Sequence, residues 1–350
     1  MIKRSFSAFI LCILVGRVLL AFETDQYNLP PVPLADIGDE VSQYVEENLL
    51  TAVNKVNADI AAQEACLEDA KRAKSCGSMA DTKKKLAFLR SNDAVAHEVF
   101  KLLGDGSLFI TKTGKWFNNH KFQHTPDRYK IAYSKSIYVF MPLDYSTMSP
   151  TVNLYGTELG TDKIEHFFQQ GYKYYTIRRD QMVSGKTASE AESKAVKWGQ
   201  RTERTYFGLL VSGVYSNADL YANYAGMKFY ASLTAAEQIG KSDRRPLLSL
   251  DEGKWFVNKD VNLRDSLIKP FITEHLNEAL NPSGYAINIY PTVKRVVRNQ
   301  ACPEWRQLLP TAKKEDLGSR SMALEKWEGE DYGYATKGWS VPLASTCFSD

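Results

Sequence analysis

The sequence predicts a mostly helical α+β protein with a minor β part, and three observations carry this prediction. Apolar residues recur at helical spacing over a long stretch of the amino-terminal third. The middle of the chain holds three segments that each begin with residues typical of a helix start. Segments rich in Tyr, Ile and Val are short, which leaves room only for small β elements.

Residues 1–21 have the organisation of a signal peptide. Lys3 and Arg4 precede an apolar run that begins at Phe6 and continues, with one break at Arg17, to Ala21. A basic start followed by an apolar stretch of about 7–15 residues is typical of export signals. The break leaves the run short of the ~20 apolar residues that span a bilayer. We expect cleavage after Ala21, with retention as an amino-terminal anchor as the alternative, and export to the periplasm or the extracellular space.

Residues 22–106 are predicted to form an extended, proline-rich start followed by a helical hairpin. The first helix follows from an apolar stripe at spacings of three and four. The stripe consists of Ile37, Val41, Val45, Leu49, Val53, Val56 and Ile60. A second helical stretch from about Thr82 to Leu103 ends at a Gly-Asp-Gly sequence and is its predicted partner.

Four cysteines follow the signal, and an even number in an exported chain favours disulfides. Three pairings are possible, and proximity in the sequence favours Cys66 with Cys76 and Cys302 with Cys347. Ten residues of helix would span ~15 Å, whereas a disulfide needs Cα atoms within ~7 Å. The first helix must therefore end near Cys66.

Residues 107–240 form the predicted central domain. Ser107–Phe122 indicates a β-hairpin that turns at Lys112–Lys115, and Ile131–Met141 indicates a further extended stretch. Three helices follow, and their predicted first capping residues are Thr161, Thr187 and Ser216. Thr187 has a glutamate three positions later, which is the pattern of a capping box.

Residues 241–350 form the predicted carboxy-terminal region. An extended piece near Trp255–Val257 precedes a helix from about Asn262 to Leu280, which an Asn-Pro-Ser-Gly sequence ends. The tail from Ile287 onward has little periodicity. We expect an irregular tail that the Cys302–Cys347 disulfide ties to the fold.

Polar residues lie beside the packing faces of the three central helices. Asp162 and His166 are an i, i+4 pair on the first helix, and Asp219 and Asn223 are an i, i+4 pair on the third. Glu203 lies at the end of the second. Gly199 and Gly226 would allow the helices to approach closely, so we expect the polar groups to converge.

The order of these residues resembles a known group of proteins. The matching elements are Asp162-Lys163-x-x-His166-Phe167, Gly199-x-x-x-Glu203 and Ser216-x-x-Asp219-Leu220-x-Ala222-Asn223-x-x-Gly226. They resemble the YfiM-like and VanZ-like group of small bacterial envelope proteins over residues ~156–233 only. The resemblance implies a bacterial envelope location and carries no reaction. Members of that group are often membrane-embedded or lipid-anchored, whereas this block is too polar to span a bilayer.

The charge balance excludes one class of function. The chain has 44 Lys and Arg residues and 41 Asp and Glu residues, and removing the three basic residues of the signal leaves 41 of each. Without net charge or a basic block, the chain lacks the electrostatic footprint of a general nucleic-acid binder. No segment after the signal approaches membrane-spanning length.

Three functions suit the polar residues. In a binding module, Glu203, Asp219, Asn223 and Ser216 would hold a small polar ligand or a hard cation, or His166 with Asp162 a transition metal. In a hydrolase acting on a phospholipid or cell-wall component, His166 would be the general base, oriented by Asp162 or Asp219, and Lys163 or Asn223 would stabilise the oxyanion. In a structural protein, the same groups would form a satisfied buried network. We rank binding or structural roles above hydrolysis, and the sequence identifies no cofactor.

Overall fold

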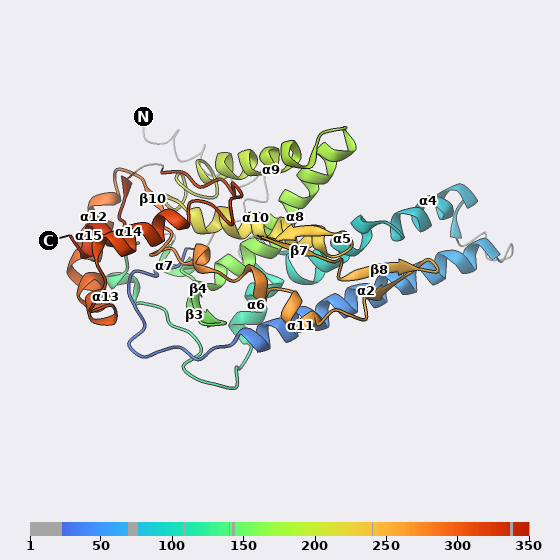
Figure 1. The fold of residues 1–350 in the computed structure, drawn as a ribbon. Helices are drawn as coiled ribbons and strands as arrows, with labels where there is room; N and C mark the ends of the chain where they lie inside the picture. Colours follow the sequence, from blue (N-terminus) through green and yellow to red (C-terminus); the bar gives the residue numbers. More distant parts are fainter. Residues whose placement is uncertain are drawn as a thin grey trace, which may run out of the picture.

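The computed structural model describes residues 23–68, 76–107, 110–139, 141, 144–239, 241–336 and 339–349. The predicted signal peptide lies outside these residues. The described chain is mostly helical, with small antiparallel sheets, which confirms the predicted fold class (Figure 1). Among the described residues, no helix is long and apolar enough to cross a bilayer.

The amino-terminal hairpin is present, with a break in its second arm. Helix α2 (Gly38–Glu68) packs against α4 (Met79–Leu89) and α5 (Asn92–Leu103). In Figure 1, α4 and the far part of α2 extend together from one side of the molecule. The break falls where the Ser91 hydroxyl donates to the Phe88 carbonyl (2.6 Å), which ends one helix before the next begins. The apolar stripe from Ile37 to Ile60 is buried along its whole length.

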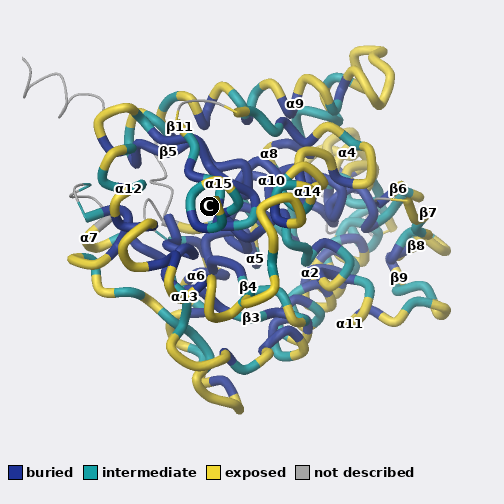
Figure 2. Tube along the Cα trace, turned by 60° about the vertical axis from the view of Figure 1, so that its left-hand side comes forward, coloured by how far each residue is buried: buried dark blue, intermediate teal, exposed yellow. Residues whose placement is uncertain are grey.

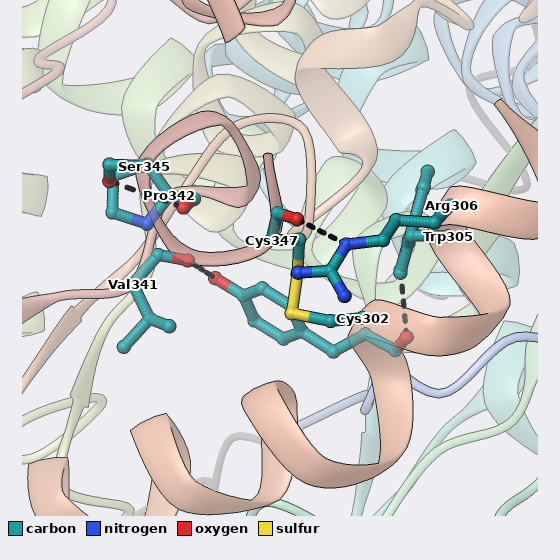
Figure 3. Close-up of a disulfide and its surroundings, with 8 residues drawn as sticks. Cys302, Trp305, Arg306, Val341, Pro342, Ser345 and Cys347 are labelled. Atoms are coloured by element: carbon teal, nitrogen blue, oxygen red, sulfur yellow. Dashed lines mark hydrogen bonds between the residues drawn. A yellow bond between two sulfur atoms is a disulfide. The ribbon is translucent and has the colours of Figure 1, made fainter. Parts of the chain in front are cut away.

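Both predicted disulfides are present. Cys66 and Cys76 have a Cα–Cα distance of 5.9 Å, and α2 ends two residues after Cys66, as the geometry requires. Cys302 and Cys347 have a Cα–Cα distance of 4.9 Å. Val341 lies near this second bond (Figure 3) and joins the tail to the amino-terminal segment, because its carbonyl accepts a hydrogen bond from the Tyr27 hydroxyl (2.9 Å).

The predicted turn at Lys112–Lys115 is wrong, because these residues begin a helix. The β-hairpin lies earlier, with β1 (Gly106–Ser107) paired to β2 (Ile110–Thr111), and α6 (Lys112–Asn119) follows directly. The reason is local: the Thr111 hydroxyl accepts a hydrogen bond from the Gly114 amide (2.9 Å) and caps the helix. Ile131–Met141 also differs from the prediction, since it contains the 3₁₀ turn η1 (Tyr133–Lys135) and no strand among its described residues.

The other β elements are short. A short helix, α7 (Asp144–Thr147), precedes the hairpin of β3 (Thr151–Leu154) and β4 (Thr157–Gly160). Further antiparallel pairs are β6 (Glu237–Ile239) with β7 (Ser242–Arg244), and β8 (Leu248–Asp251) with β9 (Lys254–Val257). A three-stranded sheet has the order β11 (Trp339–Ser340), β10 (Gly284–Tyr285), β5 (Val214–Tyr215).

The three central helices begin close to the predicted positions. They are α8 (Thr161–Val183), α9 (Ala188–Glu203) and α10 (Asn217–Ser232). Thr187 and Glu190 form the predicted capping box, and the Ser216 hydroxyl caps α10 by accepting from the Asp219 amide (3.1 Å). At α8 the capping position is Gly160, and Thr161 is the first helical residue. Every residue of α10 is buried, so this helix is the centre of the molecule.

Close contact between α8 and α10 depends on two glycines. A Cβ atom at Gly226 would lie 1.9 Å from the Phe167 carbonyl oxygen, and one at Gly171 would lie 2.6 Å from the Gly226 Cα. Both distances are shorter than the contacts that Cβ atoms make in real structures. Gly226 therefore allows the close approach of the two helices, as predicted. Gly199 instead accommodates the Tyr174 ring.

The predicted helix from Asn262 to Leu280 is wrong as a continuous element. The segment consists of α11 (Leu263–Ser266) and the 3₁₀ turns η2 (Lys269–Phe271) and η3 (Glu274–Leu276). Pro270 lacks an amide hydrogen and interrupts the helical pattern. The tail carries short helices between irregular connections: α12 (Tyr290–Val296), the π-helical turn η4 (Val297–Ala301), α13 (Cys302–Leu308), α14 (Lys314–Ala323) and α15 (Leu343–Cys347).

Residues 23–28 run through the interior as an extended segment. All six are buried, like the residues of α10 (Figure 2). The Ser149 amide donates to the Glu23 carbonyl (2.9 Å), and the Trp305 indole donates to the Tyr27 carbonyl (2.8 Å). This segment therefore connects the start of the central helices to the carboxy-terminal tail.

Candidate functional site

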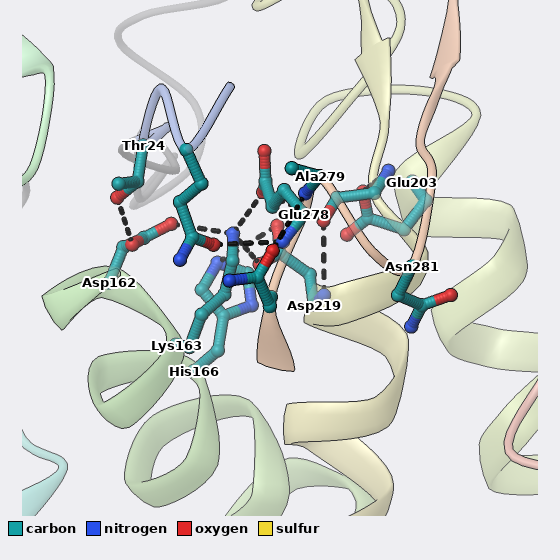
Figure 4. A network of polar contacts seen from close by, with 12 residues as sticks. Thr24, Asp162, Lys163, His166, Glu203, Asp219, Glu278, Ala279 and Asn281 are labelled. Carbon is teal, nitrogen blue, oxygen red and sulfur yellow. Dashed lines mark hydrogen bonds and ion pairs between the residues drawn. The ribbon is translucent and has the colours of Figure 1, made fainter. Parts of the chain in front are cut away.

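The first turns of α8 and α10 lie together and bring the predicted polar residues into one buried cluster (Figure 4). Asp162, Lys163 and His166 come from α8, and Asp219 and Asn223 come from α10. The predicted convergence is present, and every one of these side chains is more than nine-tenths buried.

Lys163 is the centre of this cluster. Its ammonium group donates to Asp162 Oδ2 (2.7 Å) and Asp219 Oδ1 (2.6 Å) and forms an ion pair with Glu278. Burial alone would lower the pKa of Lys163, but these carboxylates outweigh it and hold the pKa well above its usual value. The lysine is therefore a permanent buried cation that joins α8, α10 and the segment after η3.

His166 completes the contact between the two helices. Its Nδ1 lies 3.2 Å from Asn223 Oδ1, and its Nε2 lies 3.7 Å from Asp219 Oδ2. The residue is 7% exposed. A general base must reach its substrate, so this burial weighs against the hydrolase hypothesis.

Ser216 and Glu203 bind the cluster to the end of α9. The Ser216 hydroxyl donates to Glu278 Oε1 (3.2 Å) in addition to capping α10. The Ser216 amide donates a long hydrogen bond to Glu203 Oε2 (3.5 Å). Burial first, and then the neighbouring Asp219, raise the pKa of Glu203 well above its usual value. Burial therefore favours the neutral, protonated form of Glu203.

Three members of the cluster were not predicted from the sequence. Glu278 follows η3, and its amide donates to Gln26 Oε1 (2.8 Å). Thr24 donates to Asp162 Oδ1 (2.6 Å). Glu23 is fully buried, and neither of its carboxyl oxygens has a hydrogen-bond partner among the described residues. No local pattern marks these residues, because they come from the extended start and from a turn far along the chain.

The cluster has more carboxyl groups than cations. Glu23, Asp162, Glu203, Asp219 and Glu278 surround a single lysine. Burial raises the pKa of Glu278 to about 7, and burial, helped by Glu278 and Asp219, raises the pKa of Glu23 well above its usual value. Protons on these groups are the simplest way to neutralise the excess charge.

One group of carboxylates has the spacing of a metal site. Oxygen atoms of Asp162, Asp219 and Glu278 lie within 4.8 Å of one another. The same three groups contact the Lys163 ammonium. The lysine therefore supplies, between these oxygens, the positive charge that a metal ion would otherwise bring.

No family model, curated protein or solved structure matches this chain. The resemblance of residues 156–233 to the YfiM-like and VanZ-like group thus stays a prediction.

A cleft lies beside a different face of α8. Its volume is about 630 Å³. Thr161 and Glu165 of α8 contribute to its wall, and none of the predicted site residues does. The lining residues are Ile110, Asn118, Arg128, Lys130, Ser146, Thr147, Met148, Ser149, Pro150, Thr161 and Glu165.

Glu165 is the buried acid of this cleft. Its Oε2 accepts hydrogen bonds from the Thr111 amide (3.0 Å) and the Thr111 hydroxyl (2.7 Å). Burial raises the pKa of Glu165 to about 7, although both of these hydrogen bonds act in the opposite direction. A carboxyl group that changes charge near neutral pH in a cleft is typical of functional sites.

Proposed function

We propose that the chain is an exported protein of the bacterial envelope that binds a small polar ligand in the cleft beside Glu165. The cleft carries this proposal. Its volume of about 630 Å³ is within the roughly 300–1,000 Å³ of small-molecule sites, and its wall combines three apolar side chains with hydroxyl, amide and charged groups.

The buried cluster supports this function because it holds the start of α8 in place. Lys163 and its three carboxylates fix the first turn of α8, and the same turn carries Thr161 and Glu165 into the cleft. Because the cluster is sealed, it suits a structural network that holds a binding site in place. Binding without chemistry therefore fits the arrangement better than hydrolysis by His166.

The two disulfides and the predicted signal support the proposed location. Disulfides persist in the periplasm and outside the cell, where thiols are not kept reduced. Envelope ligands such as cell-wall fragments or imported nutrients would be available to the protein in either place.

A ligand screen that includes a variant with a large side chain in the cleft tests the proposal. Asn118 is exposed and lines the cleft, whereas its neighbour Asn119 is exposed outside it. We expect a thermal-shift screen of the mature protein against small polar compounds to give ligands that Asn118→Trp no longer binds and Asn119→Trp still binds. If no compound binds, or if binding survives in Asn118→Trp, the proposal is wrong.

A second candidate, cation binding in the buried cluster, is favoured by its unpartnered oxygens. Both carboxyl oxygens of Glu23, Oε1 of Glu203 and Oδ2 of Asp219 are buried without a hydrogen-bond partner. Oxygen ligands of this type suit a hard cation such as Ca²⁺. Elemental analysis of protein purified without chelators tests this candidate. A stoichiometric metal lost in Glu23→Gln would support it, and a metal content below one-tenth of the protein would exclude it.

A further inference from the structure

Two side chains of opposite charge line the cleft without neutralising each other. Lys130 is on the segment before β3, and Glu165 is on α8. Both line the same cavity, and no ion pair between them is present among the described residues. A single ligand with two charges can therefore contact both.

Among the described residues that line the cleft, Lys130 is the cation without a hydrogen bond or ion pair. Burial lowers its pKa, and no carboxylate of the described residues forms an ion pair with it. Arg128 is different, because its guanidinium group is already used. It donates to Asp127 Oδ1 (2.7 Å) and to the carbonyls of Phe117 (2.6 Å) and His120 (3.2 Å). An anionic group in the cleft would thus find Lys130 available.

Glu165 has one oxygen left for a ligand. Thr111 uses Oε2, whereas Oε1 makes no hydrogen bond with the described residues. The carboxyl group is also fixed in position by Gly114, where a Cβ atom would lie 2.3 Å from it. An amino group next to Oε1 would receive a charge-assisted hydrogen bond from a pre-positioned acceptor.

We propose that the cleft binds a zwitterionic ligand, an amino acid or a short peptide, with its carboxylate on Lys130 and its amino group on Glu165. This inference rests on the proposed function, because it names the ligand of the same cleft. The Thr161 and Ser149 side chains on the wall can hydrogen-bond peptide groups, and Met148 and Pro150 can contact small apolar side chains.

Glu165 gives the binding of this ligand class a distinctive pH dependence. The pKa of Glu165 is about 7, so the ionised form that attracts an amino group becomes dominant only above that pH. The charged groups around it are Arg128 and Lys130 on the cleft wall and Asp162 on its own helix. A peptide should therefore bind more tightly at pH 8 than at pH 6. A simple anion should show the reverse, because ionised Glu165 repels it.

Calorimetric titration of the mature protein with di- and trialanine tests the proposal. We expect binding that weakens about tenfold or more when the amino group is acetylated or the carboxylate is amidated. Glu165→Gln should weaken binding of the free peptide and remove its pH dependence, and Lys130→Gln should weaken it at every pH. Lys135→Gln, an exposed lysine outside the cleft, is the matched control.

The outcomes separate this inference from the proposed function. The zwitterion assignment is wrong if acetylated or amidated peptides bind as tightly as free peptides. It is also wrong if Lys130→Gln and Lys135→Gln have the same affinity for the free peptide. If no peptide binds while another screened compound binds and is lost in Asn118→Trp, the cleft is a ligand site of a different class. Melting curves of each variant establish that a lost affinity is not lost folding.

Discussion

Replacing Lys163 with methionine should destabilise the protein strongly. Methionine has a similar length and fills the same space without a charge. The change removes the one lysine that, among the described residues, forms ion pairs with Asp162, Asp219 and Glu278, and all four side chains are buried. Removing one partner from a buried ion pair costs about 3–5 kcal/mol, because the other charge is left uncompensated. Here three carboxylates lose their partner, so we expect at least the upper end of that range.

Urea unfolding of the mature protein at pH 8 measures this loss. Small domains are stable by only about 5–15 kcal/mol, so Lys163→Met should unfold at a much lower urea concentration or fail to fold. The deficit should shrink at pH 5, where the carboxyl groups can take up protons. A divalent cation that fits among three oxygens within 4.8 Å should restore part of it.

The matched control is Lys55→Met, which removes an exposed i, i+4 partner of Asp59 on α2. Such surface pairs contribute about 0–1 kcal/mol. If the two variants lose equal stability, Lys163 does not stabilise the fold by neutralising the buried carboxylates. A loss at Lys163 that does not depend on pH would equally refute the reasoning, because it would mean that packing and not charge is lost.

Three further predictions concern packing and protonation. Gly226→Ala should lower the free energy of unfolding, measured by chemical denaturation, by at least about 1–3 kcal/mol, because the new Cβ would overlap the Phe167 carbonyl. An unchanged denaturation midpoint would show that α8 and α10 can separate freely. Val53→Asp should lower the free energy of unfolding by on the order of 3–5 kcal/mol, because it buries an unpaired charge. Unchanged thermal stability would mean that the apolar stripe on α2 is exposed. The pKa of Glu278 is raised from 4.5 to about 7, so its contribution to stability is full below pH 4.5 and is lost as the pH rises through 7. The melting temperature should therefore fall from pH 5.5 to pH 8, and it should fall less in Glu278→Gln; a rise in both proteins would contradict the assigned protonation.

Local signals in the sequence predicted the central helices and all members of the cluster except Glu23, Thr24 and Glu278. Thr187 and Ser216 each mark a helix start through a side chain that bonds the backbone three residues later, so sequence alone is sufficient. The Asp162/His166 and Asp219/Asn223 pairs lie on one face of their helices for the same reason of short-range geometry. Gly226 indicated the close helix contact that joins these faces.

Long-range contacts supplied what the sequence could not show. Glu278 meets Lys163 across more than a hundred residues, and Glu23 comes from a segment without periodicity. The cleft has the same origin, because Lys130 and Glu165 belong to separate elements and neither is part of a recognisable pattern. Lys112–Lys115 was predicted as a turn because its Gly and Lys residues suit a hairpin, whereas the cap from Thr111 favours helix.

The most direct test of the account compares two neighbouring residues of α8, measured for both stability and peptide binding. His166 is on the sealed face and bonds Asn223, whereas Glu165 lines the cleft. His166→Ala should lower the free energy of unfolding by about 1–3 kcal/mol, because its partners stay buried and unpaired, and the remaining folded protein should bind trialanine normally. Glu165→Gln keeps an acceptor for Thr111, so it should unfold like the parent protein and lose its affinity for trialanine. The reverse result, with binding lost in His166→Ala at unchanged stability and retained in Glu165→Gln, would place the functional site in the buried cluster and contradict the account.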